Sequence, residues 1–305
     1  MSLIVTGSVG IDTVETPDGQ RADDVLGGSS IYFAAGASFF TKVRLVAAVG
    51  EDFPEHFQEQ FQQFDVCTDG LEQREGSKTF RWHGRYHENM NDRDTLAVEL
   101  NVLGEALPPV PDHYRDSKYV FLANTHPAGQ MALLDQFPEA KLVVADTMDL
   151  WIETEKDLLT ELLGKIDGFV LNDAEAKQLT GESNVVRAAD KVLAMGPTFV
   201  IVKKGEHGAI LRHKDGTGVL PAFPAHEVVD PTGAGDSFAS GMMGYLTAAD
   251  DISVASIKRA MAYGTVVASY TIEKFSTHRL SEIDREQIDA RLETFGSHLD
   301  IGAGI

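Results

Sequence analysis

Short apolar runs rich in β-branched residues alternate along this 305-residue chain with segments of helical periodicity. The runs are nearly continuous, which is typical of strands buried on both faces of a parallel sheet. Strands are predicted at Leu3–Thr6, Val43–Val49, Lys118–Leu122, Lys141–Ala145, Gly168–Leu171 and Thr198–Val202. Helices are predicted at Ser29–Phe40, Pro54–Phe64, Gln130–Phe137, Glu155–Leu163, Ala174–Leu179 and Val185–Met195. This order indicates βαβ units and an α/β fold with a doubly wound, mostly parallel sheet flanked by helices.

Two segments interrupt this alternation. Ile11–Leu26 contains a Pro-Asp-Gly turn and is predicted to be a hairpin. Phe80–Tyr86 alternates aromatic with polar residues, as a half-exposed strand does, and is expected to pair with Thr95–Leu100. Together they predict a small β lid over about residues 12–26 and 78–101, although two surface hairpins without function fit the pattern equally well. No linker or repeat divides the chain, so residues 1–305 are predicted to form a single domain.

The charge balance excludes some partners. With 26 Lys and Arg against 47 Asp and Glu, the net charge is −21, which argues against nucleic acid and anionic membranes. No stretch approaches the ~20 apolar residues that span a bilayer. The only cysteine, Cys67, leaves no disulfide framework and favours a reducing, cytoplasmic setting. A polyanionic ligand such as ATP would need a local site that overrides this net charge.

The most informative run is Asp-Pro-Thr-Gly-Ala-Gly-Asp-Ser-Phe at residues 230–238, followed by apolar residues at helical spacing. We expect Gly233–Gly235 to form a turn that opens into a helix, with Asp236 in its first turn. The free amides and the dipole at such a helix start form an anion hole that stabilises a transferring phosphoryl group. An aspartate there accepts a proton from an attacking hydroxyl. The alternative is that Asp236 only caps the helix and the glycines only turn the chain.

The whole string resembles the C-terminal signature of the ribokinase-like, PfkB-type carbohydrate kinases. Three further family motifs precede it in the chain, in the expected order: Gly27-Gly28-Ser29, Asn172-Asp173-Ala174-Glu175 and Lys203-Lys204-Gly205-Glu206-His207-Gly208-Ala209. The resemblance spans nearly the whole chain and implies a ribokinase-like fold. It also implies an ATP-dependent phosphotransferase acting on an alcohol of a small sugar or nucleoside. Asp236 would be the general base, and the anion hole would comprise Gly233, Ala234, Gly235 and the Asp236 amide.

The resemblance assigns further roles by position. The acceptor would be bound by Asp12, Gly27, Gly28 and Ser29. The nucleotide would be bound by Asn172, Lys203, Gly205, Gly208, Ala262 and Gly264. Glu175 would hold Mg²⁺ through water, because oxygen ligands suit a hard cation. Asp230 and Thr232 match the residues of a monovalent-cation site, and whether K⁺ binds is left open.

Three departures from the family pattern bear on specificity. The di-glycine is followed by Ser-Ser-Ile-Tyr instead of Lys-Gly-Ala-Asn, which does not support ribose itself as the acceptor. Lys203 replaces the usual threonine, and Glu273–Ser276 replaces a Gly-Ala pair. A non-catalytic sugar- or nucleotide-binding regulator on the same fold is the alternative function, disfavoured because Asp236 is retained. An exposed edge of the lid would allow a homodimer.

Overall fold

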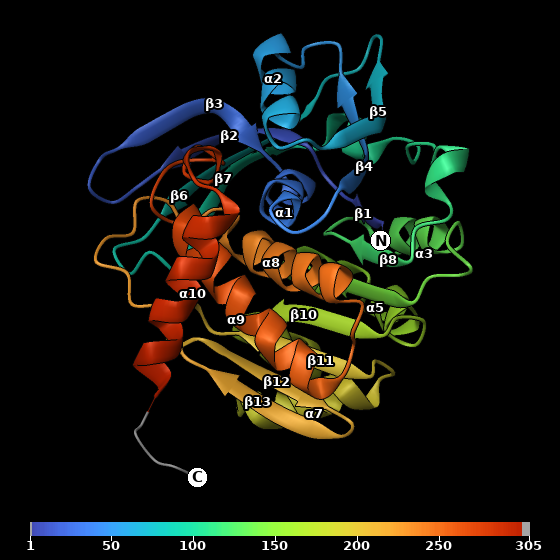
Figure 1. The fold of residues 1–305 in the computed structure, drawn as a ribbon. Coiled ribbons are helices and arrows are strands. Elements are labelled where there is room, and N and C mark those ends of the chain that lie inside the picture. The colour runs from blue at the N-terminus through green and yellow to red at the C-terminus, as the bar shows by residue number, and fades with distance from the viewer. Residues whose placement is uncertain (1, 301–305) are drawn as a thin grey trace.

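The computed structural model describes residues 2–300 and contains a nine-stranded sheet in the order β13-β12-β11-β10-β9-β8-β1-β4-β5 (Figure 1). The strands from β11 to β5 are parallel, and at one edge β12 pairs antiparallel with both β11 and β13. Their bounds are β1 Leu3–Thr6, β4 Val43–Gly50, β5 Cys67–Arg74, β8 Tyr119–Leu122, β9 Leu142–Asp146, β10 Gly168–Asn172, β11 Phe199–Lys203, β12 Ala209–His213 and β13 Gly216–Leu220. The six strands predicted for the parallel sheet all lie in it, which confirms the mostly parallel α/β fold.

Helices cover both faces of the sheet, which explains the continuous apolar runs. Along β1, Leu3 and Val5 join one buried cluster, and Ile4 joins the cluster on the opposite face. The first cluster includes side chains from α1 Ser29–Ser38, α2 Glu55–Gln63, α8 Ala234–Ala249, α9 Val254–Thr271 and α10 Arg285–Leu299. The second includes side chains from α3 Pro127–Leu134, α4 Asp149–Thr154, α5 Lys156–Leu163, α6 Asp173–Thr180 and α7 Val185–Ala194. Among residues 2–300, no helix is long and apolar enough to cross a membrane.

Some elements differ from the sequence prediction. Helix α3 begins three residues before the predicted Gln130, because Pro127 occupies its first position and the His126 side chain accepts a hydrogen bond from the Ala128 amide. Strand β12 and the two edge strands, β5 and β13, were not predicted, since polar residues interrupt their apolar pattern. Short 3₁₀ turns lie at Asn101–Gly104, Asp112–Tyr114, Gly205–His207 and Leu280–Glu282.

The two interrupting segments form one four-stranded sheet in the order β3-β2-β6-β7 (Figure 1). Its strands are β2 Gly10–Glu15, β3 Arg21–Gly27, β6 Phe80–Tyr86 and β7 Arg93–Glu99. Each hairpin is antiparallel, and β2 and β6 pair in parallel to join the hairpins. The predicted small sheet is therefore present. All residues of its edge strand β7 are exposed.

Candidate active site

Polar side chains end three neighbouring strands of the main sheet. Asp146 is the last residue of β9, Asn172 of β10 and Lys203 of β11. Asn172 pairs directly with Lys203, and Asp146 pairs with Val170, two residues before Asn172. Because parallel strands present their carboxyl ends at the same edge, these side chains meet there, where α/β sheets bind ligands.

Helix α8 begins over the same edge. Its N-cap, Gly233, has φ +74°, a left-handed conformation that favours glycine. A Cβ at Gly233 would lie 2.2 Å from the Cγ of Tyr32, whose side chain is buried. A Cβ at Gly235 would lie 2.6 Å from the Nζ of Lys203. The predicted turn and helix start are therefore confirmed, with first-turn amides that have no acceptor inside the helix.

Asp236 lies in the first turn of α8 beside a second carboxyl group. Burial raises the pKa of Asp236 to about 6, although the charges of Lys203 and Arg93 and a hydrogen bond from the Asp146 side chain oppose this rise. Asp146 is only 4% exposed and its Oδ1 has no partner. Burial and the charge of Asp236 raise the pKa of Asp146 well above its ordinary value. A raised pKa favours the protonated form of Asp146, and the hydrogen bond from its side chain favours the ionised form of Asp236.

The Asn172 and Glu175 side chains form a capping box at the start of α6. The Glu175 amide donates to Asn172 Oδ1 at 2.8 Å, and the Asn172 amide donates to Glu175 Oε2 at 2.7 Å. Burial raises the pKa of Glu175, and the charge of Lys203 lowers it. This motif thus caps the helix and also places a carboxylate beside Lys203.

The predicted acceptor residues come together between β2, β3 and α1. A Cβ at Gly27 would lie 1.9 Å from Asp12 Oδ2, so only glycine fits beside this carboxyl group. The Gly28 amide donates to Asp12, and Ser29 Oγ lies 3.1 Å from Ser8 Oγ. Asp12 is buried, and its Oδ1 has no partner. Burial, reinforced by the charge of Asp230, raises the pKa of Asp12 to about 8, so this group is largely neutral at pH 7.

Asp230 lies against the segment that follows α9. Its Oδ1 accepts from the Thr232 amide at 2.9 Å, and its fully buried Oδ2 has no partner. The Val229 amide donates to the Ile272 carbonyl at 2.8 Å. Burial raises the pKa of Asp230, although hydrogen bonds from Thr232 and Ser276 lower it. The Ser276 hydroxyl donates to the Leu26 carbonyl at 2.5 Å, which connects this segment to the acceptor residues.

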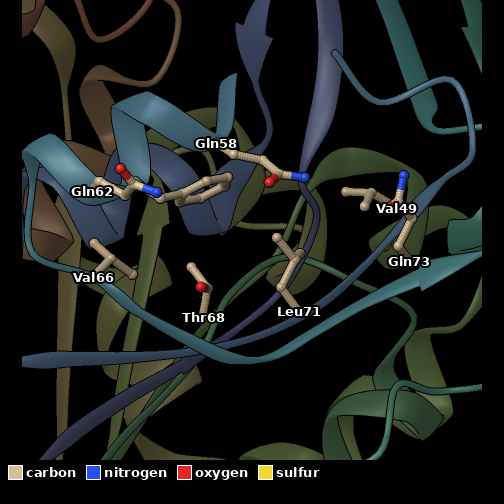
Figure 2. A pocket seen from close by; sticks show the side chains of 8 residues that line it. Val49, Gln58, Gln62, Val66, Thr68, Leu71 and Gln73 are labelled. Carbon is tan, nitrogen blue, oxygen red and sulfur yellow. The ribbon is translucent and has the colours of Figure 1, made fainter. Parts of the chain in front are cut away.

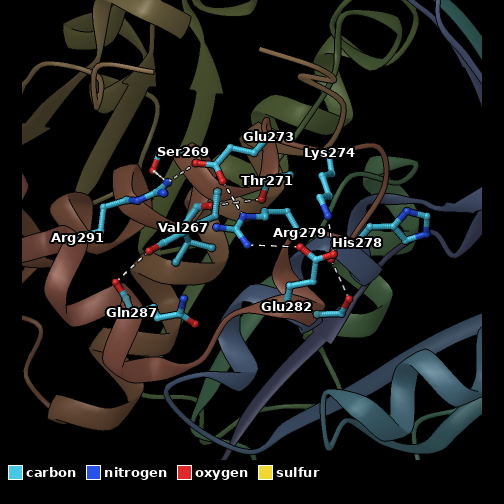
Figure 3. Close-up of polar contacts among 12 residues, drawn as sticks. Val267, Ser269, Thr271, Glu273, Lys274, His278, Arg279, Glu282, Gln287 and Arg291 are labelled. Carbon is cyan, nitrogen blue, oxygen red and sulfur yellow. Dashed lines mark hydrogen bonds and ion pairs between the residues drawn. The ribbon is translucent and has the colours of Figure 1, made fainter. Parts of the chain in front are cut away.

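Glu273 fixes this segment by pairing with two arginines (Figure 3). Its carboxylate lies 2.6 Å from Arg279 Nε and 2.8 Å from an Arg291 nitrogen. The Arg291 guanidinium stacks 3.3 Å from the centre of the Tyr270 ring. Glu273, which departs from the family pattern, therefore links the segment after α9 to the middle of α10.

The four-stranded sheet contacts the site at two places. The Tyr86 hydroxyl lies 3.1 Å from Thr232 Oγ1. In the turn between β6 and β7, Asn91 Oδ1 lies 2.5 Å from the position of a Cβ at Gly205. The loop after β11 itself requires Gly208, which has φ +84° and would place a Cβ 2.0 Å from the Leu220 carbonyl oxygen.

Ala262 and Gly264 lie on α9, away from these loops in sequence. Gly264 is buried where α9 packs on α8, and a Cβ there would lie 2.5 Å from the Phe238 carbonyl oxygen. Ala262 is half-buried. The role of Gly264 in the structure is close helix packing, and a border with adenine stays a prediction for both residues.

Two cavities lie outside the cluster of motif residues. One, of about 180 Å³, lies between α2 and the strands β4 and β5 and is lined by Val49, Gln58, Phe61, Gln62, Val66, Thr68, Leu71 and Gln73 (Figure 2). None of the predicted site residues lines it. The other, of about 310 Å³, is lined by Phe223, Pro224, Ala225, His226, Glu227, Val229, Ser269, Glu273 and Arg291. It borders the segment after α9.

Three residues near the site were not singled out as site residues in the sequence: Tyr32, Asp146 and Arg93. Only Asp146 could have been found from the local sequence, because it ends a predicted buried strand at the edge where ligands bind. The other two reach the site through contacts between distant segments.

The nine-stranded sheet and this edge define a ribokinase-fold protein, and solved structures confirm the fold. The Methanocaldococcus jannaschii nucleoside kinase superposes on 96% of this chain with 98% of its own chain, at a TM-score of 0.77 and 20% sequence identity. A Burkholderia thailandensis nucleoside kinase in complex with inosine gives the same values.

Sequence comparison gives the family. Residues 3–284 match the pfkB family carbohydrate kinases, and the chain belongs to this family. A cytidine kinase of Thermococcus kodakarensis is 32% identical over 253 residues, which cover 80% of this chain and 87% of the relative. The protein is accordingly a sugar or nucleoside kinase that uses ATP. The resemblance seen in the motifs is confirmed.

Proposed function

We propose that the protein transfers the γ-phosphoryl group of ATP to a hydroxyl group of a nucleoside, with Asp236 as the general base. The observation that carries this proposal is the position of Asp236 in the first turn of α8, beside Lys203 and Asp146. A carboxylate with a pKa of about 6 is ionised at neutral pH and basic enough to take the hydroxyl proton.

The helix start supports the proposed anion hole. The amides of Gly233, Ala234, Gly235 and Asp236 belong to the end of α8 where the dipole is positive. Negative charge that develops on the transferred group would be stabilised by these amides and by the ammonium group of Lys203. The hydrogen bond from Asp146 would hold the Asp236 carboxylate in place. We further propose that Asn172, Gly205 and Gly208 contact the nucleotide.

The acceptor pocket supports a substrate with hydroxyl groups. Asp12 is buried with one oxygen unpartnered, and Gly27 leaves space directly beside it. Two hydroxyls of a ribose ring would satisfy this carboxyl group. A nucleoside is favoured over a free sugar because the cytidine kinase relative aligns with most of this chain. Residues 1–305 would form one domain, with the four-stranded sheet as its lid.

Two cations fit the residues present. Glu175 supplies a carboxylate oxygen beside Lys203, a ligand that Mg²⁺ prefers, directly or through water. Bound Mg²⁺ would neutralise charge on the ATP phosphates. The unpartnered, fully buried Asp230 Oδ2 fits a monovalent cation, and Asp230 and Thr232 would hold K⁺. ATP chemistry and the single free cysteine, Cys67, fit a cytoplasmic setting.

Screening acceptors for ADP release tests the function. We expect ADP release with ATP and Mg²⁺ to depend on an added nucleoside, and the phosphorylated nucleoside to appear in equal amount. Cytidine, uridine, adenosine, inosine and guanosine would be compared with ribose, fructose and 2-keto-3-deoxygluconate. Release with a sugar alone would refute the nucleoside proposal. Tight binding of a nucleoside without turnover would favour a regulator instead.

The exposed strand β7 supports a homodimer through the lid. Leu96 and Val98 are 42% and 48% exposed on an edge strand, which leaves apolar surface and backbone groups available for pairing. We expect light scattering to give the mass of a dimer for the wild type and of a monomer for Val98→Lys. Val186→Lys is the matched control, because Val186 is 41% exposed on α7, far from β7 in the sequence. A monomeric wild type would refute this proposal.

A further inference from the structure

The arginines of the four-stranded sheet differ in their partners. Arg21 and Arg85 pair with Glu15, and Arg81 pairs with Asp24. No ion pair joins Arg93 to any residue between 2 and 300. An unpaired guanidinium in a chain of net charge −21 is available for an anionic ligand.

Arg93 lies close to the proposed phosphate site. It is the first residue of β7 and pairs across the hairpin with Tyr86, whose hydroxyl contacts Thr232. Two residues before it, Asn91 contacts the loop at Gly205. These contacts place the start of β7 between the anion-hole turn and the loop after β11.

The charge of Arg93 reaches groups on separate elements. It lowers the pKa of Asp236 on α8 and of Glu175 on α6, in each case after the larger effects of burial and Lys203. The guanidinium carbon lies 5.9 Å from the centre of the Trp82 ring, and the Trp82 indole donates to Thr95 Oγ1 at 3.3 Å. The indole therefore offers a fixed face against which the guanidinium rests.

We propose that Arg93 binds the γ-phosphate of ATP and stays bound to the phosphoryl group during transfer, opposite Lys203. This inference rests on the proposed function. In the step, the bond between the γ-phosphorus and the bridging oxygen of ADP breaks, the acceptor oxygen bonds to phosphorus, and its proton passes to Asp236. The guanidinium exchanges no proton, and its planar pair of donors offsets charge on two phosphoryl oxygens.

The four-stranded sheet thereby supplies part of the catalytic charge. Lys203 is fixed at the end of β11, whereas Arg93 is carried by a strand outside the main sheet. The full positive charge is assembled only when this sheet lies against the two loops, as it does here through Tyr86 and Asn91. ATP bound without that contact would be less activated toward water.

Two substitutions test the role of Arg93. We expect Arg93→Gln to lower kcat by about 100-fold, in the range seen when one donor to a developing oxyanion is removed. Arg93→Lys should retain part of the rate, because it keeps the charge and loses the paired geometry. In calorimetry without acceptor, Arg93→Gln should weaken ATP binding about 10-fold and leave ADP binding unchanged. Arg85→Gln, which removes an ion-paired arginine of the same sheet, is the matched control.

Each outcome separates this inference from the proposed function. If Arg93→Gln retains the kcat of Arg85→Gln, or weakens ATP and ADP equally, the γ-phosphate contact is refuted while the kinase proposal stands. If the wild type transfers no phosphate to any acceptor, the proposed function fails, and the ATP-to-ADP affinity ratio still decides the contact. Arg93 is exposed, so melting temperatures of these variants should match the wild type.

Discussion

An Asp236→Asn variant is expected to lose phosphoryl transfer by about 10²- to 10⁴-fold while binding ATP nearly as tightly as the wild type. Asparagine retains the size of the side chain but cannot accept the proton of the acceptor hydroxyl. Nucleotide binding is preserved because the amides of α8 and the ammonium of Lys203 remain. The rate is measured by coupled ADP release with the best nucleoside, and affinity by calorimetry.

The control for this variant is Asp157→Asn. Asp157 also lies in the first turn of a helix, α5, so its replacement removes a comparable interaction with a helix dipole, worth about 0.3–1 kcal/mol. It should leave turnover unchanged. Survival of most of the turnover in Asp236→Asn would mean that Asp236 only caps α8, the alternative that its position in the sequence allowed.

The pH profile gives a second readout of the same residue. Because the base acts in its ionised form and burial raises its pKa to about 6, the wild-type rate should be full above pH 7 and fall as the pH drops through about 6. Replacing Asp146 by Ala removes a hydrogen bond that favours the ionised form of Asp236. The acid limb should then move to higher pH, and Asp146→Asn, which still donates, should move it less.

Whether a strand could be predicted from the sequence depends on how completely its residues are buried. Strands such as Leu3–Thr6 are covered on both faces, so each residue is apolar and the run itself reveals the strand. Strand β5, Cys67–Arg74, lies at the sheet edge with several partly exposed charged residues, and its pattern resembles a loop. The order of the strands, and the parallel pairing of β2 with β6, follow from contacts that no local pattern encodes.

The residues of the site also differ in whether the sequence could predict them. Gly233 and Asp236 belong to one contiguous motif, whose geometry a helix start dictates. Asp146 and Arg93 lie 90 and 143 residues before Asp236. Both lower the pKa of Asp236, Asp146 by a hydrogen bond and Arg93 by its charge. Their contribution arises only when the strands assemble, so spacing along the chain cannot show it.

The net charge of −21 has to be interpreted together with the ion pairs of the structure. Lysines and arginines over most of the surface are neutralised by neighbouring carboxylates, as Arg212 is by Asp190 and Lys177 by Asp173. Lys203 and Arg93 instead direct their charge at Asp236 and Glu175. Two positive charges thus act on the carboxyl groups at this edge of the sheet, and at physiological salt screening over ~8 Å isolates them from distant carboxylates.

Replacing Gly233 by alanine should damage both stability and catalysis. The residue has φ +74°, so a Cβ introduces backbone strain of about 1–2 kcal/mol. The same Cβ would lie 2.2 Å from the ring of Tyr32, which is 1% exposed, so either the buried ring or the start of α8 must shift. Overpacking of this kind adds about 1–3 kcal/mol. We therefore expect the free energy of unfolding in urea to fall by about 2–5 kcal/mol.

Gly181→Ala separates the two causes. Gly181 ends α6 with φ +71°, and a Cβ there would have no heavy atom within 4 Å. This variant carries the backbone strain alone, so it should lose about 1–2 kcal/mol and keep full activity. In Gly233→Ala, relief of the clash shifts the start of α8, and kcat should fall by about 10²- to 10³-fold because the amides and Asp236 move together. Equal losses of stability in the two variants would show that Tyr32 yields, and that glycine is required at 233 for its backbone conformation alone.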